Sequence, residues 1–150
     1  MSFYMVLVTI HVLSAILGMG PGFFMIHLIK KATNMTELKH AYRLRSSLHI
    51  FVMIGGTLLL VTGLWMGFLN PALFKQGWYV TSLIMYLIAL SFGPLLLSPV
   101  SKPLKKYVKE YEGEEIPEKY YEMEKKLVRV ERFENTLFFI IILLMILKPF

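Results

Sequence analysis

The chain has 150 residues, and its composition places it among helical membrane proteins: 56% of the residues are hydrophobic and the mean hydropathy is +0.59. Because there is no cysteine, disulfides, thiolate metal sites and c-type haem attachment are excluded. The formal charge is +6. Basic residues beside membrane spans set orientation or contact anionic headgroups, so we expect the lipid bilayer, and no nucleic acid, as the partner.

Four apolar segments follow one another along the chain. The first three are free of charged residues, and each is long enough for a crossing of about 20 residues. The last run is shorter. It reaches a crossing length only if Phe133 and Phe150 are its ends and Lys148 snorkels to the interface. The predicted spans are residues 3–29, 47–69, 78–99 and 133–150.

A charged segment, residues 102–134, separates the third span from the fourth. After Pro117 its apolar residues recur every three or four positions, which predicts helix rather than disorder. We expect the spans and this segment to form one domain, residues 1–150. The predicted fold class is all-α, an integral membrane four-helix up-down bundle whose third and fourth helices extend into the cytoplasm.

Basic residues determine the expected orientation in the membrane. The connection from Lys30 to Arg45 holds five lysines and arginines against one acid, Glu37. Such an excess is typical of cytoplasmic loops, so both termini should lie outside. Residues Tyr107 to Glu134 would then lie in the cytoplasm, where they could dock a protein partner or form a solvated helix face.

Two spans carry a histidine followed by small residues on one helical face. The two sets are His11, Ala15, Gly18 and Gly22 in the first span, and His49, Gly56, Gly63 and Gly67 in the second. Ionisable residues at membrane depth are costly and usually functional. The small residues favour close helix packing, or they leave room for a flat macrocycle whose metal the histidine ligates.

Depth decides which histidines could share a metal. With a rise of about 1.5 Å per residue and antiparallel helices, His11 lies roughly 20 Å from the level of His49, too far for one haem iron. His27 and His49 lie at a similar depth near the cytoplasmic side, and could share an iron if the helix bend turns them together. Arg43 and Arg45 at the same surface could hold the propionates.

His11 needs a different partner at its own depth. The sixth position could be open, or a thioether could fill it, from Met66, Met85 or Met145. Without a metal, His11 would bond a backbone carbonyl freed by the bend at Pro21, and His27 would snorkel to the interface. His40 lies in the polar connection and is expected to be solvated.

Several of these features resemble a group of small four-helix membrane proteins. The group includes the haem-containing oxygen-independent protoporphyrinogen oxidases, the membrane domain of copper-resistance protein D and uncharacterised integral membrane proteins, which are the nearest. The resemblance rests on His11 with its Gly-Met-Gly bend, on Arg43 and Arg45 before a helix ending Thr62-Gly63-Leu64-Trp65, on Arg132-Phe133-Glu134-Asn135, and on Lys148-Pro149-Phe150. It implies a membrane haem fold.

The third helix departs from the oxidase pattern. In that pattern a lysine follows a Gly-Trp pair, whereas Gly77-Trp78 is followed here by Tyr79, Val80, Thr81 and Ser82. The resemblance therefore implies haem b more than it implies the oxidase activity. The candidate iron ligands are His11, His27 and His49, and the candidate cofactor-binding residues also include Arg43 and Arg45.

The sequence contains no other catalytic set. It has no aspartate, and every glutamate lies in a polar segment, so an intramembrane carboxylate relay is excluded. We expect a b-type haem protein of a bacterial or archaeal cell membrane that transfers electrons, with a quinol as one candidate donor, or binds a small ligand. The alternatives are a protoporphyrinogen-oxidase-like enzyme and a cofactor-free accessory or assembly subunit of a membrane complex.

Overall fold

The computed structural model describes residues 2–150, and all regular elements in that range are helical. The α-helices are α1 (Phe3–Lys30), α2 (Met35–Leu69), α3 (Gly77–Phe92), α4 (Ser98–Glu110) and α5 (Glu118–Leu147). A 3-10 helix, η1 (Pro71–Lys75), connects α2 to α3, and a π-helical turn, η2 (Gly93–Leu97), joins α3 to α4. The all-α fold class is confirmed.

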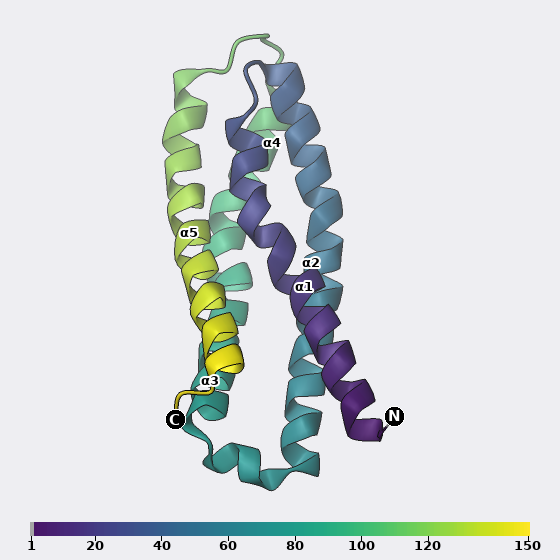
Figure 1. Cartoon of the computed structure of the whole chain (residues 1–150). Coiled ribbons are helices and arrows are strands. Elements are labelled where there is room, and N and C mark those ends of the chain that lie inside the picture. Colours follow the sequence, from purple (N-terminus) through teal and green to yellow (C-terminus); the bar gives the residue numbers. More distant parts are fainter. Residues whose placement is uncertain (1) are drawn as a thin grey trace.

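The chain runs along the long axis of the molecule four times (Figure 1). α1 lies beside α2 in the opposite direction, and α3, η2 and α4 form one rod that lies beside α5. The start of α1, η1 and the end of α5 lie at the same end of the molecule, which we call the termini end. The opposite end, which we call the loop end, holds the connections at residues 31–34 and 111–117.

Three helical segments in the described part of the chain are long and apolar enough to cross a membrane: α1, α2 and the rod Gly77–Glu110. Between 17% and 33% of their most apolar windows is buried inside the protein, and large side chains such as Ile16, Phe24 and Phe68 are exposed. Lipid, but not water, readily solvates such a surface. Membrane-spanning helices are therefore confirmed for these three segments, and the fourth crossing, by α5, stays a prediction.

α2 begins at Met35, twelve residues before the predicted span. The Asn34 side chain accepts the Glu37 N–H at 2.9 Å, and the Glu37 carboxylate accepts the N–H and the hydroxyl of Thr33 at 2.8 and 2.9 Å. These bonds satisfy N–H groups that a helix start leaves free. The predicted polar connection from Lys30 to Arg45 is therefore wrong over most of its length, because the cap starts the helix at Met35 and the charged residues that follow belong to its first turns.

Glycines allow α1 and α2 to approach closely where they cross. A Cβ added at Gly18 would lie 2.7 Å from the backbone nitrogen of Gly56 and 2.9 Å from the carbonyl carbon of Gly55. These neighbours are backbone atoms, so a side chain at this point would push the helices apart. Close packing is therefore the role of the small residues at Gly18 and Gly56.

Two clusters of buried side chains hold the helices together. The loop-end core consists of Ile29, Met35, Leu38, Ala41, Tyr42, Leu104, Val108, Tyr120, Leu127 and Val128. The membrane core consists of Met19, Leu59, Tyr86, Ala89, Phe138 and Ile141. The apolar positions that predict helix in the charged segment 102–134 thus pack inside the protein, against α1 and α2.

Candidate functional site

His11 is half-buried on α1, and its ring is held by α2. Its Nδ1 lies 2.8 Å from the Thr62 hydroxyl oxygen, which itself donates to the carbonyl of Leu58 at 2.7 Å. We assign the single hydroxyl proton of Thr62 to the Leu58 carbonyl, in which case Nδ1 carries its proton and donates to Thr62. This pattern leaves Nε2 with a free lone pair, which can accept a hydrogen bond or bind a metal.

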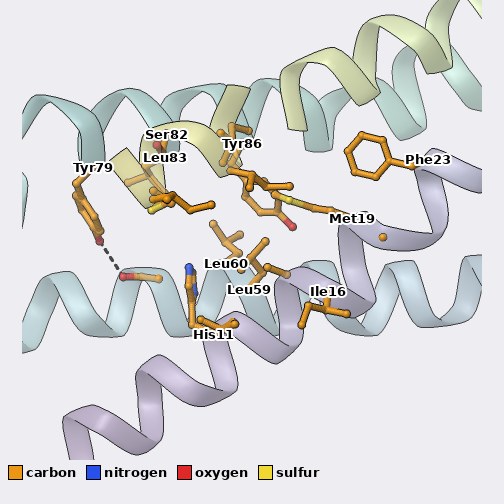
Figure 2. Close-up of a pocket in the computed structure, with 18 residues that line it drawn as sticks. His11, Ile16, Met19, Phe23, Leu59, Leu60, Tyr79, Ser82, Leu83 and Tyr86 are labelled. Carbon is orange, nitrogen blue, oxygen red and sulfur yellow. Dashed lines mark hydrogen bonds between the residues drawn. The ribbon is translucent and has the colours of Figure 1, made fainter. Parts of the chain in front are cut away.

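His11 faces a cavity of about 430 Å³ between α1, α2, α3 and α5 (Figure 2). The wall is almost entirely apolar, and its only polar side chains are His11, Tyr79, Ser82 and Tyr86. Two methionines, Met19 and Met145, also line it, whereas Met66 and Met85 do not. A concave apolar site with a few polar groups is the usual form of a small-ligand pocket.

Two tyrosines of α3 line the cavity and connect this helix to α2. Tyr79 donates to the carbonyl of Gly63 and Tyr86 donates to the carbonyl of Gly56, both at 2.8 Å. Figure 2 shows the Tyr79 bond at the edge of the cavity. Since both hydroxyl protons are used, the tyrosines fix the spacing of α2 and α3 and are not free donors toward a ligand.

Ser82 lies between these tyrosines on α3. It is fully buried, and its Oγ is the only buried side-chain nitrogen or oxygen in residues 2–150 without a hydrogen-bond partner. A buried hydroxyl without a partner costs about 1–3 kcal/mol. The Ser82 hydroxyl is therefore sealed behind the cavity wall and is not presented to a ligand in the cavity.

The other candidate histidines lie away from this cavity. His27 on α1 and His49 on α2 are both exposed, and neither lines this cavity. His49 lies thirteen residues before Thr62 on the same helix, which is about 20 Å along the axis. His11 and His49 are therefore far apart in depth. Within the described residues, no group of three or more histidines and acidic residues is placed to hold a metal ion.

The structure gives the two candidate arginines different surroundings. Arg43 is exposed, whereas Arg45 is buried and forms a bidentate ion pair with Glu131 of α5. The ion pair offsets part of the cost of burying the two charges. Arg45 thus ties α2 to α5 at the loop end, and its donors face Glu131 rather than a cofactor.

A second, smaller and more polar hollow lies at the loop end, between the end of α1 and the start of α5. Lys30, Tyr120, Tyr121 and Glu124 are among its lining residues. Burial raises the pKa of the Glu124 carboxyl, and the nearby Lys30 opposes this rise. Burial also raises the pKa of Tyr120, whose hydroxyl lies 3.3 Å from that of Tyr42. This polar hollow thus borders the loop-end core, with which it shares Tyr120.

Two residues of the site were not predicted from the sequence. In the sequence, Thr62 appears only within the motif Thr62-Gly63-Leu64-Trp65. Ser82 appears only near the position where the oxidase pattern has a lysine. Thr62 lies on a different helix from His11, fifty-one positions away, so no local spacing connects them. Ser82 stands out only through burial without a partner, which a sequence does not display. Tyr79 and Tyr86 of α3 also line the cavity.

The comparison with protein families gives one result for nearly the whole chain. The sequence model of a family described as "Predicted integral membrane protein (DUF2269)" matches residues 5–149. The chain belongs to this family. The match supports a small integral membrane protein, in agreement with the three apolar helical segments.

Searches of curated proteins and of solved structures found no match to this DUF2269 protein. The family description carries no cofactor, substrate or reaction. The functional argument for the DUF2269 protein therefore rests on its own cavity and on His11.

Proposed function

We propose that the protein is a membrane b-type haem protein in which His11 holds the iron through Nε2. The observation that carries this proposal is the 2.8 Å contact of His11 Nδ1 with the Thr62 hydroxyl beside an apolar cavity. With the proton on Nδ1, as assigned above, Nε2 keeps a free lone pair. A metal-binding histidine usually donates its other N–H to a fixed acceptor in this way. Thr62 would fill that supporting role.

The residues around the cavity are compatible with haem b. Its wall offers an apolar surface for a macrocycle, and Met19 and Met145 bring thioethers to the same space. No basic residue lines the cavity, but Lys148 follows one turn after Met145 at the termini end, 5.2 Å from the centre of the Trp78 ring. Propionates would find a cation there.

The protein itself would bind the haem, orient the His11 ring and exclude water from the iron ligand. Thr62 fixes the tautomer and the direction of the His11 ring. The apolar residues of the wall keep water away from the iron ligand, and their low polarity would tune its potential. Haem b, when bound, supplies one-electron chemistry, and a quinol in the bilayer is the electron donor we propose.

An absorption spectrum of the purified protein tests this proposal. Protein expressed with sufficient haem should show a Soret band, and His11→Ala should lose it because the iron ligand is removed. His27→Ala and His49→Ala, which change exposed histidines of the same two helices, should keep the band. If His11→Ala keeps the band while the other two variants lose it, the iron is held by the His27–His49 pair and not in the cavity.

The competing functions give different results in the same preparation. Reduction of the haem by a quinol analogue would support electron transfer. Rescue of a porphyrinogen-oxidase-deficient strain, with a haem that quinol does not reduce, would support the enzyme. A protein without a Soret band that copurifies with a larger complex would support a cofactor-free subunit, docked through residues Tyr107 to Glu134.

We further propose that the chain crosses the membrane four times as an up-down bundle, with the loop end and the segment 102–134 in the cytoplasm. The basic residues gathered at the loop end support this orientation. Single cysteines at Lys39, near the loop end, and at Gln76, at the termini end, test it in intact cells. An impermeant thiol reagent should label position 76 only, and labelling of position 39 from outside would contradict the orientation.

A further inference from the structure

The polar hollow at the loop end contains one acidic and one basic side chain that do not pair. Glu124 comes from α5, and Lys30 is the last residue of α1. Lys30 is near enough to oppose the rise in the pKa of the Glu124 carboxyl, yet the ion pairs within residues 2–150 involve neither residue. The hollow has a volume of about 270 Å³. It therefore offers opposite charges, side by side, to a ligand that carries both signs.

The Glu124 carboxylate has no partner from the described part of the chain. The residue is only 8% exposed, and a buried carboxylate is costly unless a hydrogen bond or a cation satisfies it. Burial and the charge of Lys30 act on this carboxyl, and no hydrogen bond within residues 2–150 does. Because Ser82 Oγ is the only unpartnered side-chain oxygen in this range that is fully sealed, the oxygens of Glu124 stay open to the hollow.

The rest of the wall suits an ammonium group on a short aliphatic chain. Tyr120 and Tyr121 line the hollow, with their ring centroids 5.6 Å apart in an edge-to-face arrangement. Aromatic rings attract cations through their faces. The remaining lining residues are aliphatic: Ile29, Ala32 and Ile116. A primary ammonium group would thus find a carboxylate to pair with and a wall of aromatic and aliphatic surface around it.

Lys30 lies at the level of the lipid headgroups. α1 has 28 residues and is therefore about 42 Å long, which matches a bilayer of about 40–45 Å with its headgroups. Lys30 is the first lysine or arginine of the chain. Phe23 lies seven residues before it on the same helical face and is 38% exposed. A lipid whose phosphate contacts Lys30 would lay an acyl chain along this apolar face.

We infer that the polar hollow binds the headgroup of phosphatidylethanolamine from the leaflet at the loop end, with the phosphate at Lys30 and the ammonium at Glu124. The two charges of this headgroup are only a few bonds apart, so one molecule can bridge both side chains. Its ammonium has N–H donors for the carboxylate, whereas phosphatidylcholine has none and phosphatidylglycerol has no cation. The site is separate from the His11 cavity and does not depend on haem.

Native mass spectrometry of the full chain in detergent tests this inference, with phosphatidylethanolamine and phosphatidylglycerol added in turn. The unchanged protein should prefer phosphatidylethanolamine. Glu124→Gln should lower the affinity for this lipid about tenfold, as expected for a lost charge-assisted hydrogen bond, without weakening phosphatidylglycerol. Lys30→Gln should weaken both lipids, because both carry a phosphate. Glu122→Gln and Lys31→Gln are the matched controls, since these exposed residues of the same segments do not line the hollow.

Three results would overturn the inference. The first is equal binding of phosphatidylethanolamine by Glu124→Gln and Glu122→Gln. The second is unchanged binding by Lys30→Gln, which is expected if Lys30 and Glu124 only pair with each other in solution. The third comes from soluble glycerophosphoethanolamine, which should bind far more weakly because it has no acyl chains. Equal affinity for this compound would show that the hollow takes a soluble ligand and not a lipid.

Discussion

Glu131→Leu is expected to lower the free energy of unfolding by about 3–5 kcal/mol. The side chains of Arg45 and Glu131 are each 8% exposed, and they form the only buried ion pair in residues 2–150. Removing the carboxylate leaves a guanidinium in the loop-end region without its partner, and burial already disfavours its charge. Denaturant unfolding in detergent micelles, followed by helix content, measures the loss.

The double variant Arg45→Met/Glu131→Leu separates the energetic effect of the ion pair from that of the packing of the two side chains. It should recover most of the lost stability, because replacing both buried charges with apolar side chains removes the desolvation cost. Glu110→Gln is the control, since its pair with Lys106 is exposed and 3.9 Å long, and should cost less than about 1 kcal/mol. A Glu131→Leu protein as stable as Glu110→Gln would show that the buried pair contributes nothing.

Gly18→Ala should destabilise the protein by about 1–3 kcal/mol, although alanine is the better helix former. The new methyl group would meet the backbone of Gly55 and Gly56 at less than 3 Å, so α1 and α2 would have to move apart. This crossing lies within one turn of the cavity residues Ala15 and Met19. The variant should therefore also weaken the binding of the proposed haem in the cavity.

Gly20→Ala is the matched control for Gly18→Ala. It lies two residues further along the same helix, and an added Cβ there would meet nothing within 4 Å. Its stability should equal or slightly exceed that of the unchanged protein. Equal thermal stability of the two variants in the same detergent would contradict the close helix contact.

The sequence predicts the helices better than their ends and contacts. Long uncharged stretches identify the membrane helices, because a bilayer requires both length and apolarity. The shared face of His11 and Gly18 correctly indicates where α1 meets α2, since a helix repeats every 3.6 residues. The charges of Lys39 and Arg43 favour a connection, whereas the cap formed by Asn34 and Glu37 starts α2 at Met35 and outweighs them.

The candidate site could be predicted only in part. His11 stands out in the sequence because an imidazole in an uncharged span needs a partner, and it lines the cavity. Its role as an iron ligand stays a prediction. That Thr62 would be this partner and that Arg45 would be occupied by Glu131 depend on how helices far apart in the sequence are rotated against each other. Helical periodicity shows which residues share one face of a helix. It does not show which face of a neighbouring helix they contact.

The two cores have a consequence for how this protein responds to its surroundings. The loop-end core lies among charged residues, where burial of side chains such as Leu104 and Leu127 is driven by water. Around Tyr86 and Phe138 of the membrane core, lipid tails are as apolar as the side chains, so van der Waals contact and hydrogen bonds between helices hold the structure. Urea and cold act on the first, and detergent or bilayer thickness on the second. The loop-end core and the membrane core lie along the same helices but depend on different interactions. A single melting temperature would therefore not describe the stability of either core.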